Sequence, residues 1–119
     1  MFDAGDHVME ILVVDTETTG LDPKSNELIE IAAILWSVSY KSVLIQVSTL
    51  ISYNQEIVNP AEPINKISPA LLLGKDFPYQ SALELINKMS HSAKYNCAHN
   101  ADFDKEFCKK NCWIGNPSF

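Results

Sequence analysis

Two acidic side chains near the N-terminus have the residue types and the spacing of a metal site. Asp15 and Glu17 follow the apolar run 11–14, which predicts a buried strand. Side chains two residues apart on a strand point to the same face, so both carboxylates leave one face at the strand's end. Burying them unpaired costs several kcal/mol, whereas Mg²⁺ and Mn²⁺ take oxygen ligands. The pair is a candidate metal site; the alternative is a strand that ends in a polar turn.

Two longer stretches resemble the signature motifs of one enzyme family. Residues 11–21 (ILVVDTETTGL), followed by 27–33 (ELIEIAA), are similar to the first motif of the DEDD 3′–5′ exonucleases, and more narrowly of their DnaQ-like proofreading branch. Residues 97–104 (CAHNADFD) are similar to the second motif, a His-Asn-Ala-x-Phe-Asp signature. The two motifs occur in the family's order, which lowers the risk of a chance match. The resemblance runs from about residue 10 to about residue 112.

The resemblance implies hydrolysis of the terminal phosphodiester at a 3′ end, with release of nucleoside monophosphates. Two divalent ions, Mg²⁺ or Mn²⁺, clamp the attacking water and the leaving oxygen in such sites. By position in the motifs, Asp15 would bridge both metals, Glu17 would bind one of them, and Asp104 would serve the second. Asp102 competes with Asp104, but the family's acid follows the Phe directly. Asp102 is then interpreted as an acid at a helix start.

The resemblance also implies that the backbone just after Asp15 and Glu17 lies close to the terminal nucleotide. The candidate substrate-binding residues are Thr16, Thr18, Thr19, Gly20 and Asn100. Each has an ordinary structural alternative, because threonines suit strands and turns, asparagine caps helices and glycine allows a sharp exit from a strand. His99 is interpreted as structural, because the family's general base belongs to a third motif.

The sequence departs from the family pattern in two places. Residues 65–68 read Asn-Lys-Ile-Ser, where the family often has His-Gly-Ile-Thr. The third motif, a His or Tyr followed by the fourth Asp, has no counterpart, because Glu106 is the last acid and no His or Tyr follows it. With three of four carboxylates and no recognisable general base, the chain is interpreted as a truncated domain with impaired activity. The alternative is an inactive exonuclease-like module that binds metal, nucleotide or a partner protein.

Composition narrows the class of protein. A length of 119 residues with 46% hydrophobic residues predicts one folded domain, 1–119. No apolar run reaches about 18 residues and the N-terminus lacks the pattern of a secretory signal, so we expect a cytoplasmic protein without a membrane span. The net charge is −6 and all nine basic residues are lysines, which disfavours tight general binding of nucleic acid.

The partners that remain are the 3′ end of a single strand and another protein. An enzyme can hold a strand end briefly through metals, backbone amides and a few lysines. DNA, RNA and short oligonucleotides all stay open as substrates, because base stacking tolerates any sequence. The candidate protein partners are a second copy of the chain and a polymerase-type protein.

Three cysteines, Cys97, Cys108 and Cys112, offer a competing interpretation. Their odd number argues against a disulfide framework. A zinc-binding scaffold remains an alternative, but their spacing matches no common closed zinc site. Free cysteines are often buried, so the sequence favours reduced thiols in the core.

The elements that must position these residues follow from apolar periodicity and turn signals. Three consecutive strands joined by short polar turns predict an antiparallel meander over 10–15, 27–38 and 41–52. An extended, proline-punctuated connection over 58–63 leads to a short helix over 68–73, which Ser68 is expected to cap. A helix over 76–92, a strand over 94–98 and a helix over 103–112 follow. The pattern alone predicts an α/β domain. The resemblance implies a ribonuclease H-like fold, a mixed sheet that opens with the meander.

Overall fold

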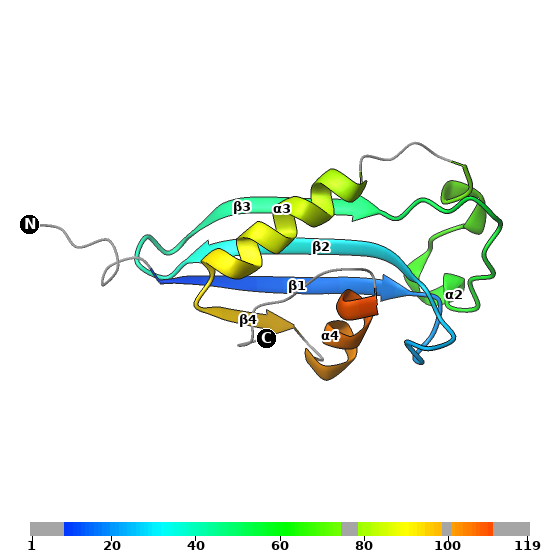
Figure 1. Ribbon diagram of the computed structural model, residues 1–119, viewed down its shortest axis with the longest axis horizontal. Helices are drawn as coiled ribbons and strands as arrows, with labels where there is room; N and C mark the ends of the chain where they lie inside the picture. The colour runs from blue at the N-terminus through cyan, green and yellow to red at the C-terminus, as the bar shows by residue number, and fades with distance from the viewer. Residues whose placement is uncertain (1–8, 75–78, 99–100, 111–119) are drawn as a thin grey trace, which may run out of the picture.

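A mixed sheet organises the chain. The computed structural model describes residues 9–74, 79–98 and 101–110, and four strands in that part form a sheet in the order β3-β2-β1-β4 (Figure 1). β1 (Glu10–Thr18) pairs antiparallel with β2 (Leu28–Ser37), which pairs antiparallel with β3 (Ser42–Leu50). β4 (Tyr95–Ala98) runs parallel to β1 on its other side. The predicted antiparallel meander and mixed sheet are confirmed.

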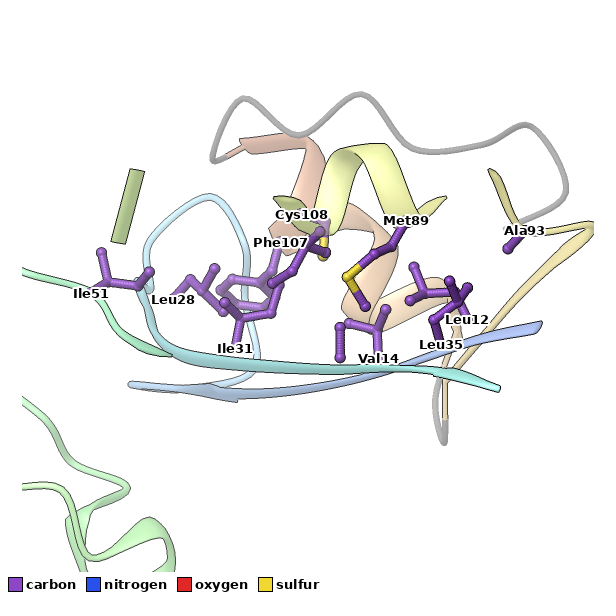
Figure 2. Close-up of a cluster of buried hydrophobic side chains, with 12 residues drawn as sticks. Leu12, Val14, Leu28, Ile31, Leu35, Ile51, Met89, Ala93, Phe107 and Cys108 are labelled. Carbon is purple, nitrogen blue, oxygen red and sulfur yellow. The ribbon is translucent and has the colours of Figure 1, made fainter. Parts of the chain in front are cut away.

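Two helices cover one face of this sheet. Figure 2 shows Phe107 of α4 (Ala101–Lys110) and Met89 of α3 (Tyr79–Ser92) over Val14 and Ile31 of the strands. Strand alternation makes this face apolar, since every second residue of β1 from Leu12 onward is buried. Among the described residues, no helix is long and apolar enough to cross a membrane. The opposite face of the sheet carries two of the candidate metal ligands, Asp15 and Glu17.

β1 is longer than predicted, and this changes where the acidic pair sits. The expected strand ended at Asp15, whereas β1 continues to Thr18. It continues because β2 keeps pairing with it, with Glu17 opposite Glu30 and a register shift only between Glu17 and Thr18. The Asp-x-Glu triplet therefore lies on the paired strand, held by the ladder, and not beyond the strand's end.

The connection after β3 is where the predictions are wrong. The expected extended segment contains a single helical turn, α2 (Glu62–Asn65), because Pro63 is tolerated in a first turn. The short helix expected over 68–73 is a 3₁₀ turn, η1 (Pro69–Leu71), and Ser68 makes no side-chain capping bond. The turn ends early because Tyr53 exchanges backbone hydrogen bonds with this segment, donating to the Leu72 carbonyl.

The last three predicted elements are present. α3 (Tyr79–Ser92) ends where expected, β4 spans nearly the expected range, and α4 begins two residues before the expected start. Residues 76–78 and 111–112 of the predicted helices lie outside the described residues. α3 and β4 are further joined by a buried pair, in which the Ser90 hydroxyl donates to the Asn96 amide oxygen at 2.7 Å.

Candidate active site

Asp15 and Glu17 project from the open face of β1. Asp15 is exposed and Glu17 is half-buried, while Thr16 between them turns to the face covered by α4. This arrangement follows from strand alternation, which separates neighbours and unites residues two apart. Two carboxylates thus share one surface next to the end of a rigid, paired strand.

A third carboxylate joins this surface from the neighbouring strand. Glu30 of β2 lies directly opposite Glu17 in the antiparallel register, and like charges in that position repel each other. Burial raises the pKa of Glu17, and the charges of Asp15, Glu30 and Asp104 raise it further. Sequence reasoning missed Glu30 as a neighbour of the pair, because only the strand register brings it there. The result is a concentrated negative potential that a divalent cation would relieve.

Asp104 is held on the other side of β1. It is buried near the start of α4 and its carboxylate accepts a hydrogen bond from the Thr16 hydroxyl. Because Thr16 points to the covered face, Asp104 lies on that side of the strand, across from the side chains of Asp15 and Glu17. It still acts electrostatically on Glu17. The structure brings Asp15 and Glu17 together, and the role of Asp104 as a metal ligand stays a prediction.

Metal-ligating residues do not form a ready-made cage in the described part of the chain. There, no group of three or more His, Cys, Asp or Glu side chains is placed to hold a metal ion. Cys97 is exposed on β4 and Cys108 is buried on α4. Burial raises the pKa of the Cys108 thiol, and the charge of Asp104 adds to this effect. Cys108 is thus a protonated core thiol, and Cys112 lies outside the described residues.

The threonines after the acidic pair order the turn that leaves β1. The Thr18 hydroxyl donates to the Gly20 carbonyl at 2.7 Å, and the Thr19 hydroxyl accepts from the Glu27 backbone amide at 2.9 Å. Gly20 has no room for a side chain, because a Cβ atom there would meet the Asn26 amide. A glycine at this position allows the Asn26 side chain to lie against the backbone. The substrate contacts of Thr16, Thr18, Thr19 and Gly20 stay predictions, and His99 and Asn100 lie outside the described residues.

Comparison with known proteins decides the family. The family model described as "RNase_T: Exonuclease" matches residues 12–116. The chain belongs to this exonuclease family. It is 34% identical over 105 residues to the DNA polymerase III subunit epsilon of Treponema pallidum and 33% identical over 103 residues to the PolC-type DNA polymerase III of Thermotoga petrophila. The predicted DnaQ-like DEDD relationship is therefore confirmed.

The matches cover most of this chain and a smaller part of the relatives. They span 81% of the chain and 46% of the epsilon subunit, and 87% of the chain and 7% of the PolC-type polymerase. Among solved structures, E. coli Exonuclease I in complex with a dT13 oligonucleotide superposes with a TM-score of 0.65 at 22% identity, over 83% of this chain and 22% of that protein. This likeness confirms the ribonuclease H-like exonuclease fold.

Asn65 stands at a position where exonuclease-family sequences often have histidine. In the structure its side chain forms hydrogen bonds to three other residues. Its amide nitrogen donates to the Thr18 carbonyl at 3.1 Å, and its amide oxygen accepts from the Ile67 backbone at 3.1 Å and from Asn59 at 3.0 Å. An asparagine side chain can donate and accept at once, so it ties α2 to the end of β1. Lys66 beside it takes the left-handed conformation, with φ of 62°.

The raised pKa of Glu17 predicts how pH affects the stability of the metal-free chain. A carboxyl whose pKa is higher in the folded state costs folding free energy where it is ionised, and this cost disappears below its unfolded-state pKa of 4.5. We expect Glu17→Gln to raise the melting temperature at pH 7, and the gain to vanish below pH 4.5.

Thermal melts from about pH 4 to pH 8 measure this difference. Glu56→Gln, an exposed acid far from β1 in sequence, is the matched control and should melt like the wild type throughout. A Glu17→Gln variant that melts at or below the wild-type temperature at pH 7 contradicts the electrostatic argument.

Proposed function

We propose that the chain is a 3′–5′ exonuclease that hydrolyses the terminal phosphodiester of single-stranded DNA or RNA with the help of divalent metal ions. The observation that carries the proposal is the position of Asp15 and Glu17. The family's acidic motif lies on a paired strand with both carboxylates on one accessible face. The similarity to polymerase III subunits supports a role beside a polymerase, and the Exonuclease I complex supports a single-stranded substrate.

The donor set suits Mg²⁺ or Mn²⁺. Asp15 and Glu17 offer carboxylate oxygens, the ligands that these hard cations prefer. Their mutual repulsion, increased by Glu30, is the electrostatic cost that a bound cation offsets. When bound, such ions supply an activated water and stabilise charge on the leaving oxygen.

The protein's own contribution is to hold the carboxylates and the adjacent backbone in fixed positions. The β1–β2 ladder fixes the two carboxylates, and the turn closed by Thr18 and Thr19 fixes the backbone where the terminal nucleotide would lie. Asn65 anchors the adjacent loop to the same strand end. In our proposal Asp104 would add a carboxylate to those of Asp15 and Glu17, and in the metal-free chain the Thr16 hydroxyl holds it beside β1 by a hydrogen bond.

A second function has specific support. The described residues include no group of three metal-ligating side chains, and no acid, His or Tyr follows Glu106. An exonuclease-like module that binds a metal, a nucleotide or a protein without hydrolysis accounts for both observations. It predicts metal-dependent binding of an oligonucleotide without turnover.

The decisive experiment follows single strands labelled at the 5′ end in the presence of Mg²⁺, Mn²⁺ or EDTA. We expect metal-dependent ladders that shorten from the 3′ end and release mononucleotides. A phosphorothioate at the 3′-terminal linkage should block the reaction, whereas the same group at the 5′-terminal linkage should not. Internal cuts, or loss of the 5′ label as a mononucleotide, would exclude the proposed direction. Binding without products favours the inactive module.

A further inference from the structure

One lysine near the acidic pair is held in a backbone conformation that its residue type disfavours. Lys66, at the end of α2, has φ of 62° and ψ of 23°, in the left-handed region. A Cβ atom is unfavourable there, so glycine is the residue that usually ends a helix in this conformation. Exonuclease-family sequences often have glycine at this position, whereas this chain has lysine. Residues strained in this way persist where their surroundings fix them, and they cluster at ligand sites.

Hydrogen bonds on both sides of Lys66 fix its conformation. The backbone amide of Lys66 closes α2 with a bond of 2.8 Å. On one side, the Asn65 amide nitrogen donates to the Thr18 carbonyl at 3.1 Å. On the other side, Ile67 is buried, and its carbonyl accepts from the Asn59 amide nitrogen at 2.7 Å. Because both neighbours are anchored, the Lys66 backbone has little freedom to relax, while its side chain is exposed.

This lysine lies beside the end of β1, where the negative charge gathers. Asn65 precedes it and is bonded to Thr18, which directly follows Glu17, and Figure 1 shows α2 at that end of the sheet. The carboxylates of Asp15 and Glu17 repel the phosphates of a nucleic acid, and the net charge of −6 adds to this repulsion. The chain contains no arginine, so lysines are its cationic side chains for phosphate. A lysine held at this end offsets part of the repulsion.

We infer that Lys66 binds a phosphate of the strand whose 3′ end lies at the acidic pair. The left-handed backbone and the bond from Asn65 to β1 keep its exposed side chain next to the strand's end. Lys66 borders a surface hollow of about 510 Å³, a volume within the range of ligand sites, whose lining also includes Asn59, Glu62 and Pro63. The inference rests on the proposed function, because its ligand is a single-stranded nucleic acid.

Binding of a fluorescein-labelled single strand in EDTA tests the inference without hydrolysis. Lys66→Gln should raise the Kd about fivefold at low salt, the effect of one charge pair at about 4 Å in water. The slope of log K against log salt concentration should decrease in magnitude by about 0.7, as expected for one lost phosphate contact to a single strand. Lys66→Arg should retain wild-type affinity and slope. Lys66→Gly should lose affinity as Lys66→Gln does, yet melt at or above the wild-type temperature, because glycine relieves the backbone.

Lys41 supplies a matched control. It is also an exposed lysine with a left-handed backbone, with φ of 52°. It lies in the turn between β2 and β3, at the opposite end of the sheet from α2 (Figure 1). Lys41→Gln should therefore leave both the Kd and the salt slope unchanged.

Four results would overturn the inference. They are a wild-type chain that does not bind the strand, Lys66→Gln with wild-type affinity and slope, Lys66→Arg that binds no better than Lys66→Gln, and an equal loss in Lys41→Gln. Parallel reactions with Mg²⁺ separate this inference from the proposed function. Hydrolysis by a wild-type chain whose binding does not depend on Lys66 contradicts the inference alone. Binding that depends on Lys66 without hydrolysis supports the inference and contradicts the exonuclease proposal.

Discussion

Asp15→Asn is expected to abolish both metal binding and hydrolysis while leaving the fold intact. In the proposed site Asp15 would supply carboxylate oxygens to the metal ions, and its side chain is exposed on a strand whose pairing does not depend on it. Metal ions contribute several kcal/mol of transition-state stabilisation, so the loss of activity should be on the order of a thousandfold or more. Removing a negative charge beside Glu17 should not lower the stability of the metal-free chain.

Two measurements check this result together. Calorimetric titration with Mn²⁺ reports binding, and thermal melts report the stabilisation that binding produces. Asp22→Asn is the matched control, since Asp22 is an acid in the turn after β1 and an asparagine keeps the oxygen that accepts from Lys24. Equal Mn²⁺ affinity in the wild type and in Asp15→Asn would mean that the acidic pair serves only the strand, and the metal-dependent proposal would fail.

The parts of the fold that the sequence predicted are those governed by local periodicity. Apolar runs in β1 and β2 and helical spacing in α3 each specify an element without reference to the rest of the chain. The second motif likewise located α4. It lies where a strand is followed directly by a helix, and this limits where Asp104 can lie. These signals were sufficient for the order of elements and for the family.

The parts that sequence reasoning missed depend on contacts between distant segments. Glu30 becomes a neighbour of Glu17 only through the register of two strands. Asn65 and Thr18 meet through a side chain-to-backbone hydrogen bond across 47 positions. The 3₁₀ turn ends where it does because Tyr53 pairs with the segment after it. No local pattern encodes such pairings, so single-sequence reasoning could not supply the electrostatics of the site.

Asp104 shows how a correctly located residue can still have an unexpected environment. The second motif predicted that Asp104 lies on a helix, and Asp104 does lie on α4. Its hydrogen bond with Thr16, however, couples a proposed substrate residue to a proposed metal ligand from the covered side of the strand. In the proposed site Thr16 would therefore act by holding Asp104. This coupling predicts that Asp104 becomes available to a metal only when another interaction replaces that of Thr16.

The wild-type chain of 119 residues is expected to hydrolyse 3′ ends far more slowly than a family member with all four carboxylates and a general base. With the three carboxylates of the proposed site, one metal ion would lack an anionic ligand, and a misplacement of about 1 Å can cost on the order of a hundredfold. A missing general base typically removes a further factor of ~10²–10⁴. The two effects together predict a rate lower by about four orders of magnitude or more.

A site that works without a side-chain base should also show it in how the rate responds to conditions. Hydrolysis should rise with pH without the plateau that a side-chain base with a pKa near neutrality produces, and added imidazole should accelerate it. The comparison is single-turnover hydrolysis of a 5′-labelled strand by this chain and by a family member whose sequence contains the third motif, with Asp15→Asn purified in parallel to measure contaminating nuclease. Fast turnover by the purified chain, with a pH plateau and no response to imidazole, would mean that a base is supplied from within these residues. His99, the one histidine in the second motif, would then be the residue to substitute next.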